Sequence, residues 1–191
     1  RIIQQALAQG LGPLFAPDFS ASSVGLRPGR SAHQAVKQVQ SSSKAGYRGA
    51  VDRDLAQFFD RVNPDAVRAR GARKVRDKAG LRLLGKYLRA GVVVGEDLPP
   101  TATGVPQGSP WSPLVSNIRV DDWDKERDRR GHQCARYGDD FLLVVTSQRA
   151  GDRVKASLTR FLPQHWKLEI NESKSTVGPT NECGFLGFTF Q

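Results

Sequence analysis

The sequence predicts an α+β fold in which a mostly antiparallel sheet carries helices packed on one face. Helical and strand-like segments are interleaved along the 191 residues. At the centre of the chain, two β-prone runs flank a glycine-containing corner at residues 137–140, which favours a tight hairpin. Since a hairpin joins antiparallel neighbours, we expect the sheet to be mostly antiparallel.

The N-terminal third of the chain predicts two helices separated by a loop. The first helix covers residues 2–15, and a loop rich in Ser, Gly and Pro follows over residues 17–30. Ser31 is the expected N-cap of the second helix, over residues 32–45, because its hydroxyl can accept a hydrogen bond from the first turn. A strand that carries Asp52 and Asp54 comes next.

The remaining two thirds alternate helices with short strands. Pro64 suits the first turn of a helix that Asn63 caps, because proline has no amide hydrogen to leave unpaired there. The predicted helices cover residues 64–73, 79–90, 112–130 and 149–163, and the predicted strands cover residues 92–94, 133–137, 141–146, 167–170 and 185–190.

Composition narrows the class of protein. The hydrophobic content is 38% and no long apolar run occurs, which excludes a membrane span. The chain has 29 basic and 19 acidic residues, a net charge of +10, as expected for a protein that binds nucleic-acid phosphates. Its two cysteines have neither zinc-site spacing nor a disulfide pattern, which indicates reduced thiols in a soluble, cytoplasmic protein.

The corner at 137–140 places Asp139 and Asp140 side by side. Two ionised carboxylates repel each other unless a cation neutralises them. Strand alternation puts Asp52 and Asp54 on one face, with Asp54 at the strand end, where an adjacent hairpin can bring Asp139 beside it. Such hard oxygen ligands suit Mg²⁺, and two ions about 4 Å apart would stabilise an in-line phosphoryl displacement. Alone, the acidic pair would indicate only a solvated turn.

Three further segments accompany the acidic ones in order. They are SVGLRPGRS at 23–31, GVPQGSPWSP at 104–113 and FLGF at 185–188. Together with the strand that ends at Asp54 and the YGDD corner at 137–140, they resemble the palm and part of the fingers of group II intron-encoded reverse transcriptases and maturases. The resemblance covers nearly the whole chain, and the ordered set is far more specific than any one motif.

The resemblance implies a polymerase palm over residues 48–191 and a partial fingers segment over residues 1–47, with the N-terminal fingers and the C-terminal thumb absent. It also implies an RNA-directed DNA polymerase, in which a primer 3′-hydroxyl attacks the α-phosphate of a nucleotide and pyrophosphate leaves. The implied cofactor is a pair of Mg²⁺ ions, with Mn²⁺ as a substitute. The implied partners are an RNA template, a DNA primer, a dNTP and structured intron RNA.

The same resemblance assigns Asp54, Asp139 and Asp140 as the metal ligands. Spacing chooses Asp54 over Asp52, because the family has an aromatic residue five positions after its metal-binding aspartate and Phe59 stands five after Asp54. Phe59 would pack under the sugar of the incoming nucleotide and favour deoxynucleotides. A core position is the alternative for this ring.

Further nucleotide contacts are implied for Gln107, Gly108 and Lys174. Gly108 would be small because the backbone lies close to a base there. Arg27 and Arg30 sit on a basic turn, where their guanidinium groups could make forked contacts with phosphates. A solvated basic loop is the alternative for these arginines, and a surface lysine for Lys174.

The chain departs from the family at several positions. Arg53 stands at an apolar strand position, Gly138 replaces an alanine, and Trp111 and Arg119 replace aliphatic residues. Two other functions stay open beside the DNA polymerase. One is an RNA-binding maturase-type protein that aids intron splicing, with polymerase activity lost or incidental. The other is an RNA-dependent RNA polymerase, which Gly138 suggests and Phe59 opposes.

Overall fold

The computed structural model describes residues 2–54, 63–89, 109–166, 170–171 and 175–190, and it leaves the side chains of residues 53, 54, 165 and 166 outside that description. The chain forms two compact units. Unit 1 comprises residues 1–19 and 57–121, and unit 2 comprises residues 20–56 and 122–191. Helix α5 (Ser112–Arg129) supplies residues to both units. The division into fingers and palm at residue 47 stays a prediction.

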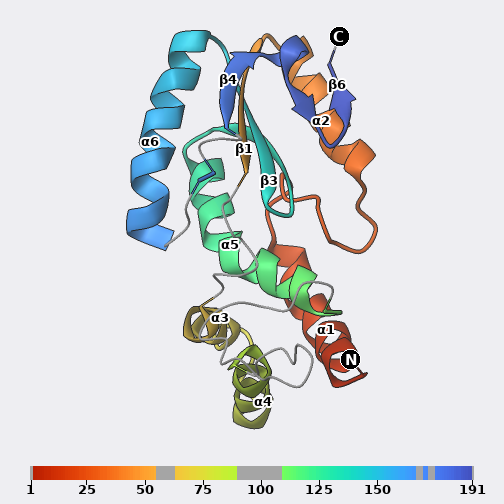
Figure 1. Cartoon of the computed structure of the whole chain (residues 1–191). Coiled ribbons are helices and arrows are strands. Elements are labelled where there is room, and N and C mark those ends of the chain that lie inside the picture. The colour runs from red at the N-terminus through yellow and green to blue at the C-terminus, as the bar shows by residue number, and fades with distance from the viewer. Residues whose placement is uncertain (1, 55–62, 90–108, 167–169, 172–174, 191) are drawn as a thin grey trace, which may run out of the picture. The chain divides into compact units, whose positions relative to one another are not determined.

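Unit 2 is built on a four-stranded antiparallel sheet in the order β2-β3-β1-β4 (Figure 1). The strands are β1 (Gly49–Asp54), β2 (Gln133–Tyr137), β3 (Asp140–Val145) and β4 (Thr176–Pro179). The predicted α+β class and its antiparallel sheet are therefore confirmed. Strand β4 was not predicted, and most of the strand expected over residues 167–170 lies outside the described residues.

Helices α5 and α6 (Gln148–Trp166) cover one face of the sheet. The Trp123 ring of α5 meets the Phe141 ring of β3 edge-on, with 4.8 Å between centroids. Gly151 lets α6 approach β4 closely, since a Cβ at this position would lie 2.6 Å from Cγ1 of Val177. These contacts form the side of the sheet that was predicted to carry helices.

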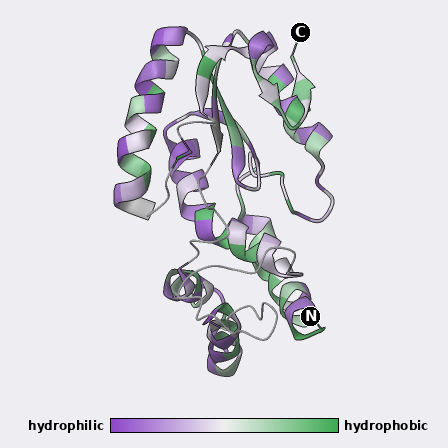
Figure 2. Cartoon of the chain, in the orientation of Figure 1, coloured by the Kyte–Doolittle hydropathy of each residue, from purple (hydrophilic) through white to green (hydrophobic). Residues whose placement is uncertain are grey.

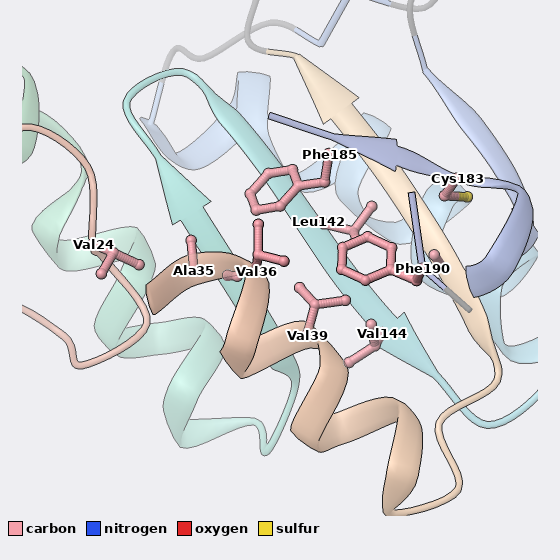
Figure 3. Packing of buried hydrophobic residues seen from close by; sticks show 11 residues of the cluster. Val24, Ala35, Val36, Val39, Leu142, Val144, Cys183, Phe185 and Phe190 are labelled. Carbon is pink, nitrogen blue, oxygen red and sulfur yellow. The ribbon is translucent and has the colours of Figure 1, made fainter. Parts of the chain in front are cut away.

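The opposite face is covered by α2 (Ala32–Lys44) and the C-terminal residues. Because strand side chains alternate between faces, Leu142 and Val144 point away from Phe141. They pack with Val39 of α2 and with aromatic residues near the C-terminus (Figure 3). Helix α2 thus adds a cover to the second face, beyond the one-sided helical packing expected from the sequence.

The segment predicted as one strand over residues 185–190 is a short hairpin. Strand β5 (Gly184–Phe185) pairs antiparallel with β6 (Phe188–Thr189) after the 3₁₀ turn η3 (Thr180–Glu182). The reversal occurs at Leu186 and Gly187, which have φ values of +55° and +80°.

Unit 1 is helical in its described part. It contains α1 (Ile2–Phe15), the 3₁₀ turn η1 (Ala16–Asp18), α3 (Pro64–Gly71), α4 (Lys78–Arg89) and the first part of α5. Its core includes Trp111, which is fully buried and meets the Tyr87 ring edge-on at 6.4 Å. Trp111, which replaces an aliphatic residue of the family, therefore occupies a core position. The hairpin arm expected over residues 92–94 lies outside the described residues.

The two predicted helix caps have different outcomes. Asn63 accepts hydrogen bonds from the amides of Asp65 and Ala66, with Pro64 in the first turn, as predicted. Ser31 occupies the N-cap position of α2, but its side chain makes no capping hydrogen bond. The backbone geometry of this cap is right, and the predicted hydroxyl contact is wrong.

Both cysteines are buried and free. Burial raises the pKa of the Cys134 thiol to about 11, and burial also raises the pKa of Cys183. Since both thiols stay protonated near neutral pH, neither is activated as a nucleophile.

Hydropathy follows the layers of unit 2. Figure 2 shows a largely hydrophobic β3 in the middle of the sheet and many hydrophilic positions along α6. Among the described helices, none combines the length and the apolar character needed to cross a membrane.

Candidate active site

The corner at residues 137–140, hereafter the 137–140 turn, is a tight hairpin as predicted. Tyr137 of β2 pairs with Asp140 of β3, so Gly138 and Asp139 are the two loop residues. Gly138 has a φ of +71°, in the region that favours glycine. Glycine at the first loop position is typical of a type II′ hairpin turn. The side chains of Asp139 and Asp140 are half-buried.

Strand β1 ends beside this turn. Its register with β3 places the backbone of Asp54 opposite Asp140 and that of Asp52 opposite Leu142. Opposed Cα atoms in an antiparallel pair lie about 4.5–5.5 Å apart. The backbones of Asp54 and the turn therefore converge as predicted, whereas Asp52 lies about 7 Å further along the strand.

The donor set at this end of the sheet fits a hard divalent cation. Carboxylate oxygens are the ligands that Mg²⁺ prefers, and adjacent strands bring three aspartate positions to one place. Among the described side chains, no three His, Cys, Asp or Glu residues form a metal-binding group. The Asp54 carboxylate lies outside that set, so its role as a ligand, and those of Asp139 and Asp140, remain predictions.

A buried arginine stands directly behind the turn. Arg136 of β2 is fully buried, and its Nε and Nη2 donate to the Asp124 carboxylate of α5 at 2.6–3.0 Å. Its Nη1 donates to the Gly138 carbonyl oxygen at 2.8 Å, and its Nη2 also donates to the Ser23 hydroxyl. From the sequence, Arg136 was placed in the strand predicted over residues 133–137 and was assigned no role. The sequence signal that could have identified its role is a charged residue next to apolar residues within a predicted strand.

Residues 20–27, hereafter loop 20–27, pack along the same edge of β2. The Arg136 amide donates to the Ser22 carbonyl at 2.8 Å, and the Val24 amide donates to the Arg136 carbonyl at 2.9 Å. A Cβ on Gly25 would lie 2.5 Å from the Gly138 nitrogen. Only glycine permits this close approach of the two backbones, so loop 20–27 packs directly against the 137–140 turn.

The two arginines predicted to bind phosphates occupy different environments. Arg27 is half-buried, and its Nη1 donates to the carbonyls of Ser20 and Ser23 at 2.9 and 2.7 Å. At least this part of its guanidinium therefore holds loop 20–27 together. Arg30 is exposed on the following turn, where a phosphate could reach it. Nucleic-acid binding by both residues stays a prediction.

The other predicted nucleotide contacts lie outside the described residues. They are Phe59, Gln107, Gly108 and Lys174. The backbone of Arg53 pairs with Phe141, and its side chain is outside the description.

Comparison with known proteins gives the family. Residues 1–190 match the family described as reverse transcriptase (RNA-dependent DNA polymerase). Protein YkfC of Escherichia coli is 28% identical over 97% of this chain and 58% of its own length. The group II intron-encoded protein LtrA of Lactococcus lactis is 32% identical over 65% of this chain and 21% of its own length. The chain therefore spans only part of these relatives.

Solved structures share the fold. Telomerase from Candida tropicalis, solved with a fragment of telomeric RNA, superposes with a TM-score of 0.70 and 16% identity, over 96% of this chain and 35% of that protein. The fold agrees with the family match along nearly the whole chain. The chain therefore belongs to the reverse transcriptase (RNA-dependent DNA polymerase) family, and a group II intron-encoded protein is among its relatives.

Proposed function

We propose that this chain is the catalytic core of an RNA-directed DNA polymerase that extends a primer by two-metal nucleotidyl transfer. The observation that carries the proposal is the backbone register that sets Asp54 opposite Asp140, next to Asp139. Family membership supports the reaction class, and this register supports its location at the 137–140 turn.

Asp54, Asp139 and Asp140 would hold the cations. When bound, a pair of Mg²⁺ ions activates the primer hydroxyl and neutralises charge on the phosphates. The residues themselves position the reactants and take up no covalent intermediate. The primer 3′-hydroxyl releases its proton to water, and its oxygen forms a bond to the α-phosphorus. The bond from the α-phosphorus to the leaving oxygen breaks, and pyrophosphate departs with its electron pair.

The proposed partners are an RNA template and a DNA primer. The net charge of +10 supports a nucleic-acid ligand, because basic side chains displace counterions from phosphates. The telomerase that shares this fold was solved with RNA. Arg30 is exposed and is proposed to contact a phosphate. The residues proposed to contact the nucleotide are Phe59, Gln107, Gly108 and Lys174.

A second candidate function is maturase-type binding of a folded intron. The similarity to a group II intron-encoded protein favours it. This function needs the basic surface but not the carboxylates, so substitution of an aspartate distinguishes it from polymerisation.

The test is extension of an annealed primer by the full chain. RNA and DNA templates are combined with dNTPs or NTPs, each with Mg²⁺ present or chelated. The proposal expects Mg²⁺-dependent incorporation of dNTPs on RNA. Incorporation of NTPs alone would indicate an RNA polymerase, and tight RNA binding without any incorporation would indicate a maturase.

Asp139→Asn sharpens this test. The change removes a charge and keeps the side-chain volume, so we expect extension to fall to background while RNA binding stays close to that of the parent. Asp152→Asn on the exposed surface of α6 is the matched control and should extend normally. Equal extension by Asp139→Asn and the parent would contradict the metal-site proposal.

A further inference from the structure

The contacts of Arg136 belong to a larger cluster that is buried except for Asp128, which is 40% exposed. Asp124 is 1% exposed and accepts hydrogen bonds from Arg136 and from Arg127, which is 2% exposed. Arg127 also donates to the Asp128 carboxylate and to the Ser22 hydroxyl. We call these residues the Arg136 cluster: Ser22, Ser23, Asp124, Arg127, Asp128 and Arg136.

The cluster is held between α5 and the sheet. The Arg127 guanidinium lies 4.9 Å from the centre of the Trp123 ring, and that ring packs against Phe141, the residue after Asp140. Because Asp124, Arg127 and Arg136 are removed from water, the hydrogen bonds among them are stronger and their geometry more fixed than at the surface. The arrangement is a rigid base behind the acidic residues.

A hydrogen bond links Arg136 to the turn and has a defined consequence. Nη1 of Arg136 donates to the carbonyl oxygen of Gly138. This carbonyl belongs to the planar peptide that also contains the amide of Asp139. Fixing the carbonyl therefore fixes the peptide plane from which Asp139 projects.

The turn is restrained on a second side by loop 20–27. The site of a Cβ on Gly25 is 2.5 Å from the Gly138 nitrogen and 2.6 Å from Tyr137 Cα. The Ser23 hydroxyl of the same loop accepts from Arg136. The loop and the arginine thus restrain one turn together.

We infer that Arg136 is a positioning residue that sets the geometry of the acidic 137–140 turn through the Gly138 carbonyl. The inference rests on the proposed function, because it supposes that this turn holds cations. Arg136 itself is fully buried behind the turn. Its effect passes through the peptide between Gly138 and Asp139.

The chemistry of the contacts explains why the residue is arginine. A guanidinium has donors fixed in a planar fork, so it can bind a carboxylate, a hydroxyl and a carbonyl in separate directions. A lysine ammonium keeps the charge beside Asp124 but is a compact, flexible donor. Arg136→Lys therefore preserves the ion pair and removes the fixed link to Gly138.

The first measurement is Mn²⁺ binding to the full chain. Binding is detected by electron paramagnetic resonance, with Mn²⁺ alone as the probe. Loss of a residue that orients metal ligands typically weakens metal binding about 10- to 100-fold, and we expect a loss of this size for Arg136→Lys. Arg149→Lys, on an exposed turn of α6, is the matched control and should bind as the parent does. Parent-like affinity in Arg136→Lys would overturn the inference.

The second measurement separates positioning from substrate binding. In primer extension we expect kcat of Arg136→Lys to fall about 100-fold, as displacement of a reacting group by about 1 Å can cause. The KM for dNTP should stay within about twofold of the parent, since Arg136 lies behind the turn rather than against the nucleotide. A rise in KM with unchanged kcat would overturn the inference.

Ser23→Ala decides the question if Arg136→Lys does not fold. It removes one hydroxyl acceptor and leaves the ion pair, so Mn²⁺ affinity should fall a few-fold, and unchanged affinity would overturn the inference. Mn²⁺ binding and primer extension by the parent chain distinguish failure of the polymerase proposal from failure of the positioning role. A parent that binds Mn²⁺ in an Arg136-dependent way but extends no primer refutes the polymerase and supports the positioning role. A parent that binds no Mn²⁺ overturns the positioning role.

Discussion

Helix α5 contributes to two arginine–carboxylate clusters that differ mainly in burial. In the Arg136 cluster, Asp124 and both of its arginine partners are at most 2% exposed. Two residues after Asp124, Glu126 accepts from Arg129 and Arg130 at 2.8 Å, but these arginines are 72% and 36% exposed. The two clusters therefore pair the same chemical groups in environments that differ in their exposure to water.

The difference shows which cluster can specify structure. Exposed ion pairs are screened by water and salt and contribute little to stability. A buried pair is costly to break because removal of one partner leaves a charge without compensation. We therefore expect the Arg136 cluster to control the geometry of the 137–140 turn and the Glu126 cluster to be nearly dispensable.

Asp124→Asn should give the largest effect. It removes a carboxylate that the buried guanidinium groups of Arg127 and Arg136 share, so we expect the free energy of unfolding to fall by about 3–5 kcal/mol. Urea denaturation of the full chain measures this change, with Asp152→Asn as the surface control. A loss below about 1 kcal/mol would contradict this prediction, because it would show that the buried cluster contributes no more stability than an exposed ion pair.

Gly25→Ala tests the other restraint on the turn with a smaller expected effect. The added Cβ would meet the backbone of Gly138 and Tyr137, which cannot move aside as a side-chain tip can. We expect a loss of about 1–3 kcal/mol in urea denaturation, as for overpacked positions. Gly178→Ala in β4, where a Cβ meets no atom within 4 Å, is the control. Equal stability of the two variants would show that the close backbone contact between loop 20–27 and the turn is not required for stability.

Glu126→Gln should give the smallest effect. Hydrogen bonds from Arg129 and then Arg130 lower the pKa of Glu126 from 4.5 to about 2. Because the folded pKa is the lower one, any stabilisation is present above about pH 4.5 and is lost as the pH falls towards about 2. The melting temperatures of variant and parent should differ slightly at neutral pH in low salt and converge in acid or in high salt. A large difference that persists in high salt would contradict the comparison.

The sequence predicted the acidic turn and its approach to Asp54 because both depend on local rules. Glycine in a two-residue corner favours a hairpin, and strand alternation places Asp52 and Asp54 on one face, with Asp54 at the strand end. The exposed cluster of α5 also follows local spacing, since Glu126 lies three and four residues before its partners.

The buried cluster was not predictable in this way. Asp124 and Arg136 are 12 positions apart and meet only when α5 packs on the sheet. Arg27 was predicted to contact phosphates, but its Nη1 is bound to carbonyls that only the folded loop brings together. Strand β4 is short and contains Gly178 and Pro179, which weaken a strand pattern, so its place depends on pairing with β1.

The most direct measurement is a Mn²⁺ titration of the full chain carrying Asp54→Asn, Asp139→Asn or both changes. If one pair of ions is shared between β1 and the turn, each single change should weaken binding strongly. The double change should add less than the sum of the two free-energy losses, because both residues serve one site. Parent-like Mn²⁺ affinity in Asp54→Asn would contradict the account, since strand β1 would then take no part in the metal centre.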